Sequence, residues 1–146
     1  MKKLFIAALL AVTVAGSAFA KDTKKTNALV IRTFQSEFKQ ASNVTWTSND
    51  NYIKATFTLN NEKMDAIYNA SGERIGTSRA ISIDELPVKT KRAFAKHYSG
   101  YAVKEAIEFN GIVENGYFIS AENENESVVL KVNGDNELSR FKVTKK

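Results

Sequence analysis

Hydrophobic and polar positions follow two different periods along this chain, and each change of period marks a boundary between predicted elements. Between residues 27 and 41, the apolar side chains of Val30, Phe34, Phe38 and Ala41 recur at helical spacing. This spacing predicts an amphipathic helix. Beyond it, apolar and polar residues alternate, which is typical of strands with one buried face. Four strands are predicted, at about residues 44–47, 53–59, 64–68 and 73–81.

The same succession is predicted a second time in the rest of the chain. Pro87, the only proline, opens a second helix that ends near Ser99 and Gly100. Ser82 and Glu85 have the spacing of a capping box, and residues 82–86 are expected to form a turn that leads into this helix. Strand patterns return at about residues 101–109, 117–122, 127–132 and 137–143.

This order predicts an α+β fold built by duplication. Each repeat, at about residues 26–81 and 82–143, is expected to hold one helix and one antiparallel four-stranded sheet. A half of this size is marginally stable by itself, so the two halves are expected to share one core. We expect the helices to pack on one face of the sheet.

The amino terminus has the pattern of a cleaved signal peptide over residues 1–20. Lys2 and Lys3 precede an apolar run from residue 4 to 14, and Ala18-Phe19-Ala20 supplies a small-residue cleavage site. The run is shorter than the roughly 20 residues that cross a bilayer as a helix, so no stable membrane anchor is expected. The mature chain, residues 21–146, is expected to be a single domain in the periplasm or secreted medium of a Gram-negative bacterium.

The positive charge of the chain lies in its tails. The formal net charge is +5, yet residues 26–141 carry thirteen basic and fifteen acidic side chains. A nucleic-acid-binding protein concentrates Lys and Arg on a structured face, so the charge distribution argues against nucleic acid as a partner.

The residue inventory excludes several kinds of chemistry. The chain has no cysteine and one histidine, His97, which we interpret as a packed or rim residue of the second helix. Cysteine nucleophiles and metal sites built from His and Cys are therefore excluded, no cofactor is expected, and we predict that the protein is not an enzyme. Glu122, Glu124 and Glu126 alternate, which fits a solvated strand end and turn, or a weak Ca²⁺ site.

Five short strings in this order resemble the β-lactamase-inhibitor-like, PepSY-like family of exported proteins from Bacteroidetes-type bacteria. The strings are Asn43-Val44-x-Trp46, Tyr52-x-Lys54-Ala55-x-Phe57, Gly72-Glu73-x-Ile75-x-Thr77, Asp84-Glu85-Leu86-Pro87 and Tyr117-Phe118. The resemblance covers nearly the whole mature chain, and it implies a duplicated helix-plus-sheet fold and a periplasmic or secreted location. The inhibitor for which the family is named is disulfide-bonded, whereas this chain has no cysteine, so inhibition and site residues are not carried over.

Two functions from different classes stay open at this point. The first is a non-enzymatic binding module that holds, and in one version restrains, an envelope protein or peptide on a sheet face free of helices. Its candidate partner-binding surface is Trp46, Tyr52, Tyr101 and Tyr117, although aromatic residues also pack in ordinary strands. The alternative is a small-ligand-binding or Ca²⁺-binding periplasmic protein, or a hydrolase that uses carboxylates such as Glu122 and Glu124. Neither the partner nor the oligomeric state follows from the sequence.

Overall fold

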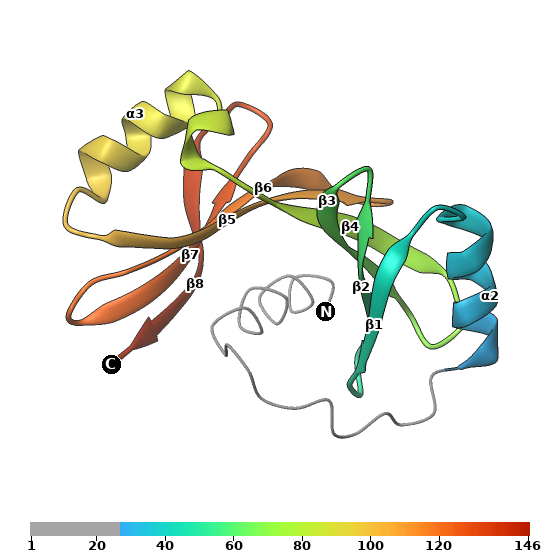
Figure 1. Cartoon of the computed structure of the whole chain (residues 1–146). Coiled ribbons are helices and arrows are strands. Elements are labelled where there is room, and N and C mark those ends of the chain that lie inside the picture. Colours follow the sequence, from blue (N-terminus) through green and yellow to red (C-terminus); the bar gives the residue numbers. More distant parts are fainter. Residues whose placement is uncertain (1–26) are drawn as a thin grey trace. The chain divides into compact units, whose positions relative to one another are not determined.

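The computed structural model describes residues 27–146, so the predicted signal peptide lies outside the described residues. The elements follow one another in the order shown in Figure 1. They are α2 (Ala28–Glu37), β1 (Ser42–Ser48), β2 (Ile53–Leu59), β3 (Glu62–Tyr68), β4 (Arg74–Ile81), the 3-10 turn η1 (Ile83–Glu85), α3 (Val88–His97), β5 (Ala102–Gly111), β6 (Asn115–Glu122), β7 (Glu126–Val132) and β8 (Leu138–Lys145). The predicted succession of helices and strands is confirmed.

The eight strands form one antiparallel sheet in which each strand lies beside the next along the chain, from β1 to β8. The α+β class is confirmed, but the duplicated unit with its own four-stranded sheet is wrong, because β4 and β5 are neighbours in one continuous sheet. A separate sheet would leave the outer backbone groups of β4 and β5 without strand partners, and joining the two strands satisfies those groups.

Contacts within the chain divide the described residues into two compact units. The amino-terminal unit comprises residues 27–79 with Asn110–Glu114, and the carboxy-terminal unit comprises Ala80–Phe109 with Asn115–Lys146. No helix within residues 27–146 is long and apolar enough to cross a membrane.

Local capping explains where the helices begin. The Asn27 side chain accepts a hydrogen bond from the backbone N–H of Leu29 at 3.0 Å, which satisfies a donor of the first turn of α2. The capping box predicted from Ser82 and Glu85 is present, but it caps the start of the 3-10 turn η1, and α3 begins after Pro87. Proline pushes the residue before it out of helical geometry, so the chain makes a turn before it enters α3.

Each unit has its own hydrophobic cluster beneath a helix. In the amino-terminal unit, α2 buries its apolar face on β2 and β3, through Val30, Phe34, Ala55, Phe57, Ala66 and Tyr68. In the carboxy-terminal unit, the residues flanking α3 pack on β5, β6 and β7, through Leu86, Tyr98, Ala106, Ile119, Ala121, Val128 and Leu130. Stability rests on these clusters, because the chain contains no disulfide.

Candidate partner-binding surface

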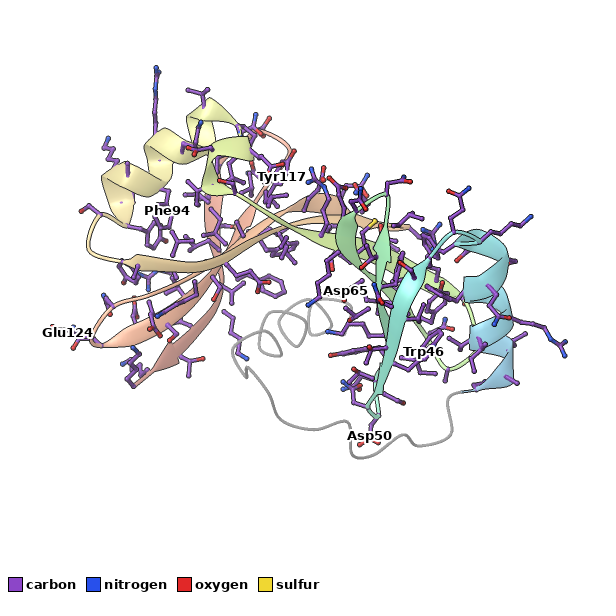
Figure 2. All side chains as sticks on the ribbon, viewed as in Figure 1. Trp46, Asp50, Asp65, Phe94, Tyr117 and Glu124 are labelled. Carbon is purple, nitrogen blue, oxygen red and sulfur yellow. The ribbon has the colours of Figure 1, made fainter. Side chains whose placement is uncertain are left out.

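The four aromatic residues predicted to meet a partner lie in different units, with Trp46 and Tyr52 in one and Tyr101 and Tyr117 in the other. Trp46, Tyr101 and Tyr117 are half-buried and pack against the hydrophobic clusters that also contact the helices. Trp46 and Tyr117 are labelled in Figure 2. The structure describes their packing, and a partner-binding role for the four residues stays a prediction.

Trp46 and Tyr52 differ in their surroundings although they lie close in sequence. The Trp46 ring meets Phe34 of α2 edge to face, with 5.2 Å between ring centroids. Tyr52 is 2% exposed and lies outside the cluster beneath α2. Burial raises the pKa of the Tyr52 phenol, while its hydrogen bond with Asn49 opposes that shift. Tyr52 therefore exposes little surface to a partner.

The strand register of the carboxy-terminal unit identifies a different surface. Ile119 pairs with Leu130 and Ala121 with Val128, and all four side chains face the cluster beneath α3. Because side chains alternate along a strand, the residues between them face the other way. We call this side, turned away from α3, the helix-free face. It carries Phe118, Ser120 and Glu122 of β6, Ser127, Val129 and Lys131 of β7, and Ser139, Phe141, Lys142 and Thr144 of β8.

Two phenylalanines from non-adjacent strands meet on the helix-free face. Phe118 of β6 and Phe141 of β8 are T-shaped, with ring centroids 5.6 Å apart and an interplanar angle of 76°. A register shift between Val129 and Leu130 lies opposite Phe141, so an extra β8 residue is accommodated there. Phe118 is fully buried while Phe141 is half-buried, so the aromatic pair offers a small apolar contact from the Phe141 side.

Basic side chains flank this aromatic pair. Lys131 pairs with Phe118 across the strands, and Lys142 pairs with Val129 at the exposed edge. Farther along β6, Glu122 binds two ammonium groups: Lys104 Nζ lies 2.6 Å from Oε1 and Lys146 Nζ lies 3.2 Å from Oε2. Hydrogen bonds from Lys104 and Lys146 hold the pKa of the Glu122 carboxyl below its ordinary value. Beside the aromatic pair, the helix-free face therefore presents the exposed ammonium group of Lys142.

An open hollow of about 530 Å³ lies at the β6–β7 turn, beside Glu122. Its lining comprises Gly100, Ala102, Glu122, Asn123, Glu124, Asn125 and Lys146. The backbone N–H of Lys146 donates to the carbonyl of Asn125 at 3.0 Å, which fixes the end of the chain against the turn. The hollow is large enough for a small polar ligand.

The three alternating carboxylates do not converge. Glu122 pairs in register with Ser127 and faces away from α3, whereas Glu126 pairs with Lys145, on the α3 side. Glu124 is exposed in the turn between them, as Figure 2 shows. No group of three or more His, Cys, Asp or Glu side chains within residues 27–146 is arranged to hold a metal ion. The arrangement does not support the Ca²⁺ interpretation.

Glu126 has a structural role on the α3 side. Its carboxylate accepts a hydrogen bond from the Tyr101 hydroxyl and pairs with Arg140, whose Nη2 lies 3.1 Å from Oε1. The Arg140 guanidinium also lies 5.9 Å from the ring centroid of Tyr98. Donation to Glu126 raises the pKa of the Tyr101 phenol, because ionisation would place two negative charges together. Glu126 therefore has its partners and is not a free base.

A second polar group lies in the amino-terminal unit, on the strand faces turned away from α2. Thr56 Oγ1 donates to Asp65 Oδ1 at 2.5 Å, and Lys54 Nζ lies 4.0 Å from Asp65 Oδ2. Asp65 is labelled in Figure 2. Lys54 is 5% exposed, and the neighbouring Ile67 and Ser78 are also buried. Asp65 therefore compensates the buried charge of Lys54, and the group presents little accessible surface to a partner.

Sequence reasoning predicted binding on a sheet face free of helices, but it did not identify Phe118 and Phe141 as residues of that face. The signal was present in Tyr117-Phe118, because two adjacent aromatic residues in a strand point to opposite faces. The register assigns Tyr117 to the α3 side and Phe118 to the helix-free face. His97 is exposed at the end of α3. Of the two interpretations given for it, a rim residue agrees with the structure and a packed residue does not.

Comparisons with known proteins show the fold. No family model and no curated protein matches the sequence. A DUF2874 family protein from Bacteroides uniformis is similar in structure, with a TM-score of 0.70 at 16% identity, covering 82% of this chain and 88% of that one. A candidate periplasmic protein from Bacteroides eggerthii has a TM-score of 0.70 at 14% identity, with the same coverage. A BLIP-like protein from Bacteroides fragilis has a TM-score of 0.66 at 15% identity, covering 82% and 85%. The chain thus has a BLIP-like fold, and the PepSY part of the predicted resemblance gains no support.

Proposed function

We propose that this protein is an exported, non-enzymatic binding module of the bacterial envelope, which holds a protein or peptide on the helix-free face. The observation that carries the proposal is the combination on one face of the Phe118–Phe141 pair and exposed Lys142. An aromatic contact surrounded by charge is the usual composition of a protein-binding patch.

The charge of the face selects the kind of partner. Glu122 is already bound by Lys104 and Lys146, and Lys142 is exposed, so Lys142 is available to an acidic segment. Charge complementarity of this kind accelerates encounter and selects partners. We infer that the partner presents Asp or Glu side chains around an apolar residue that contacts Phe141.

Export and the lack of catalysis belong to the same proposal. The signal-peptide pattern of residues 1–20 supports export, as does similarity to a structure described as a candidate periplasmic protein. BLIP-like structural neighbours are consistent with a binding role. Of the two carboxylates that sequence analysis named for hydrolysis, Glu122 is bound by Lys104 and Lys146, and Glu124 is exposed in a turn.

Substitutions on the helix-free face test the proposal. Envelope proteins cross-linked to the tagged mature chain are compared between the wild type, Phe141→Ala and Lys142→Glu. We expect each variant to lose at least about tenfold in recovered complex, because each changes a side chain on which the proposed contact depends. Lys96→Glu, which changes an exposed lysine of α3, is the matched control and should bind like the wild type. Equal recovery with Phe141→Ala, Lys142→Glu and the wild type contradicts the proposal.

The small-ligand alternative rests on the hollow beside Glu122. A polar ligand there would contact Asn123 and Glu124 and compete with Lys146 for Glu122. This version predicts a rise in melting temperature with ligands such as amino acids or short glycans, and loss of that rise in Glu122→Gln. If no ligand in a broad panel raises the melting temperature, the alternative fails.

A further inference from the structure

β8 forms one edge of the eight-stranded sheet (Figure 1), because β7 is the only strand that pairs with it within residues 27–146. Residues 142–146 are all exposed, whereas β7 buries every second residue from Val128 onward. A strand with an unpaired outer edge and with exposed side chains on both faces is open to pairing with a further strand.

The register shows which backbone groups of β8 point outward. The N–H of Lys146 donates to the carbonyl of Asn125 in the β6–β7 turn at 3.0 Å. In an antiparallel ladder, this bond flanks the pair of Glu126 with Lys145, whose own backbone groups then point apart. Pairs of this type recur at every second position, so Val143 belongs to the next one. The N–H and C=O groups of Val143 and Lys145 therefore point away from β7, and no hydrogen bond within residues 27–146 uses them.

This open edge carries positive charge only. Between residues 138 and 146, every charged side chain is basic. Arg140 and Lys146 already pair with glutamates. Lys142 and Lys145 are exposed, and neither forms an ion pair within residues 27–146. Their ammonium groups are available to a strand that carries carboxylates.

The spacing of the two lysines sets the spacing of those carboxylates. Lys142 lies on the helix-free face and Lys145 on the α3 side. Residues of an added strand that lie directly opposite them share those faces and are also three positions apart. Val143 is 40% exposed, so it suits an apolar residue opposite it. The favoured segment therefore has Asp or Glu three residues apart, with an apolar residue next to the one that meets Lys142.

The same features argue against other occupants of the edge. A second copy of this chain would bring the basic β8 of one copy beside that of the other, and like charges in opposed strands are unfavourable. Edge lysines protect a sheet from such pairing, but they leave it open to an acidic strand. Anionic lipid attracts lysines as well, but this attraction does not use the outward N–H groups. Charge and backbone together favour an extended acidic segment of a protein.

We propose that β8 receives an extended acidic segment of the partner protein as a ninth strand, which pairs with the outward backbone groups of Val143 and Lys145. Strand addition of this kind takes affinity from main-chain hydrogen bonds and specificity from alternate side chains. The inference rests on the proposed function, because the added strand brings the partner's acidic and apolar residues beside Lys142 and Phe141.

A displayed library of random peptides, selected against the mature chain, tests the added strand. We expect enrichment of peptides with Asp or Glu three residues apart and an apolar residue between them. For the most enriched peptide, Val143→Pro should raise the Kd at least about tenfold, because proline removes an outward N–H group and no hydrogen bond to β7. Val143→Ala is the matched control, since it shortens the same side chain and keeps the N–H group, and it should bind the peptide like the wild type.

Methylation of backbone nitrogens in the selected peptide tests the same contact on the wild-type chain, whatever the stability of Val143→Pro. The N–H groups of one alternate set of peptide residues point toward β8, and those of the other set point away. Methylating the first set should abolish binding, and methylating the second set should preserve it. Binding should also weaken as NaCl rises, because the lysine contacts are ionic.

Several results overturn the added strand. These are a selection without the acidic spacing, equal peptide binding by Val143→Pro and the wild type, or equal binding after methylation of either set. Co-sedimentation with phosphatidylethanolamine–phosphatidylglycerol vesicles that Lys142→Glu abolishes and Val143→Pro preserves, without any enriched peptide, identifies a lipid contact and also overturns it.

The envelope complex separates this inference from the proposed function. Recovery that falls in Phe141→Ala and Lys142→Glu but not in Val143→Pro leaves the binding function standing and removes the added strand. Wild-type recovery in all three variants contradicts both.

Discussion

Tyr68 and Tyr101 make the same kind of contact in the two units, each placing its hydroxyl on a carboxylate that also pairs with an arginine. Tyr68 donates to Glu37 at 3.0 Å, and Arg74 pairs with the same glutamate. Burial and the bond to Glu37 raise the pKa of the Tyr68 phenol. The corresponding group in the other unit is Tyr101 with Glu126 and Arg140. Tyr68 ties α2 to β3, and Tyr101 ties the start of β5 to β7 and β8.

Removing either hydroxyl therefore lowers stability without changing the shape of the core. We expect Tyr68→Phe and Tyr101→Phe each to reduce the free energy of unfolding by about 1 kcal/mol, the net value of one such hydrogen bond. Tyr117→Phe is the matched control, because the Tyr117 hydroxyl makes no hydrogen bond within residues 27–146, and it should be nearly neutral. Urea denaturation at pH 7 measures all three. An equal loss in the control contradicts the assignment.

Glu122 gives stability a specific pH dependence. Its pKa is lowered in the folded state, so its pairing with Lys104 and Lys146 stabilises the protein above the unfolded pKa. That contribution is lost as pH falls through the folded pKa. We expect wild type to exceed Glu122→Gln in stability at pH 7, and the difference to shrink as the pH is lowered below about 4.5. Urea denaturation over this pH range measures it, and a constant difference contradicts the pairing.

At the scale of elements, the periodic pattern predicted the type and order of the helices and strands, but it did not predict which strands are neighbours in the sheet. The first helix was predicted to extend to residue 41 but ends at Glu37, although Phe38 and Ala41 still pack on the same cluster. Alternation indicates which residues share a face, and it carries no information about which strand lies alongside. The adjacency of β4 and β5 therefore had no signal in the pattern.

The β3–β4 turn depends on the backbone freedom of one glycine. Gly72 has a φ of +85°, and a Cβ there would lie 2.8 Å from Cγ of Leu29 in α2. We expect Gly72→Ala to lower the free energy of unfolding by about 1–2 kcal/mol, since an L-residue disfavours this backbone region. Gly134→Ala is the control, because nothing lies within 4 Å of the added methyl group. Thermal denaturation measures both variants. An equal fall in melting temperature for Gly72→Ala and Gly134→Ala would contradict the requirement for glycine at position 72.

At the scale of the whole molecule, sequence reasoning predicted that aromatic residues bind a partner on a sheet face free of helices, but alternation alone did not show which aromatic residues lie on that face. Trp46, Tyr101 and Tyr117 pack into the clusters that contact the helices, while Phe118 and Phe141 occupy the opposite side of the carboxy-terminal strands. A period of two gives the same alternation for both faces, so the choice depends on where the helix packs. The surface proposed here follows from the register of β6, β7 and β8.

Lysine footprinting tests the binding role of the helix-free face most directly. Acylation of each lysine is quantified by mass spectrometry in two samples. One is the mature chain alone, and the other is its complex with envelope proteins, formed without a cross-linker. We predict that Lys142 is protected in the complex, while Lys96 on α3 reacts equally in both samples. Protection of Lys96 with full reactivity at Lys142 would place the partner on the helix side and contradict the account.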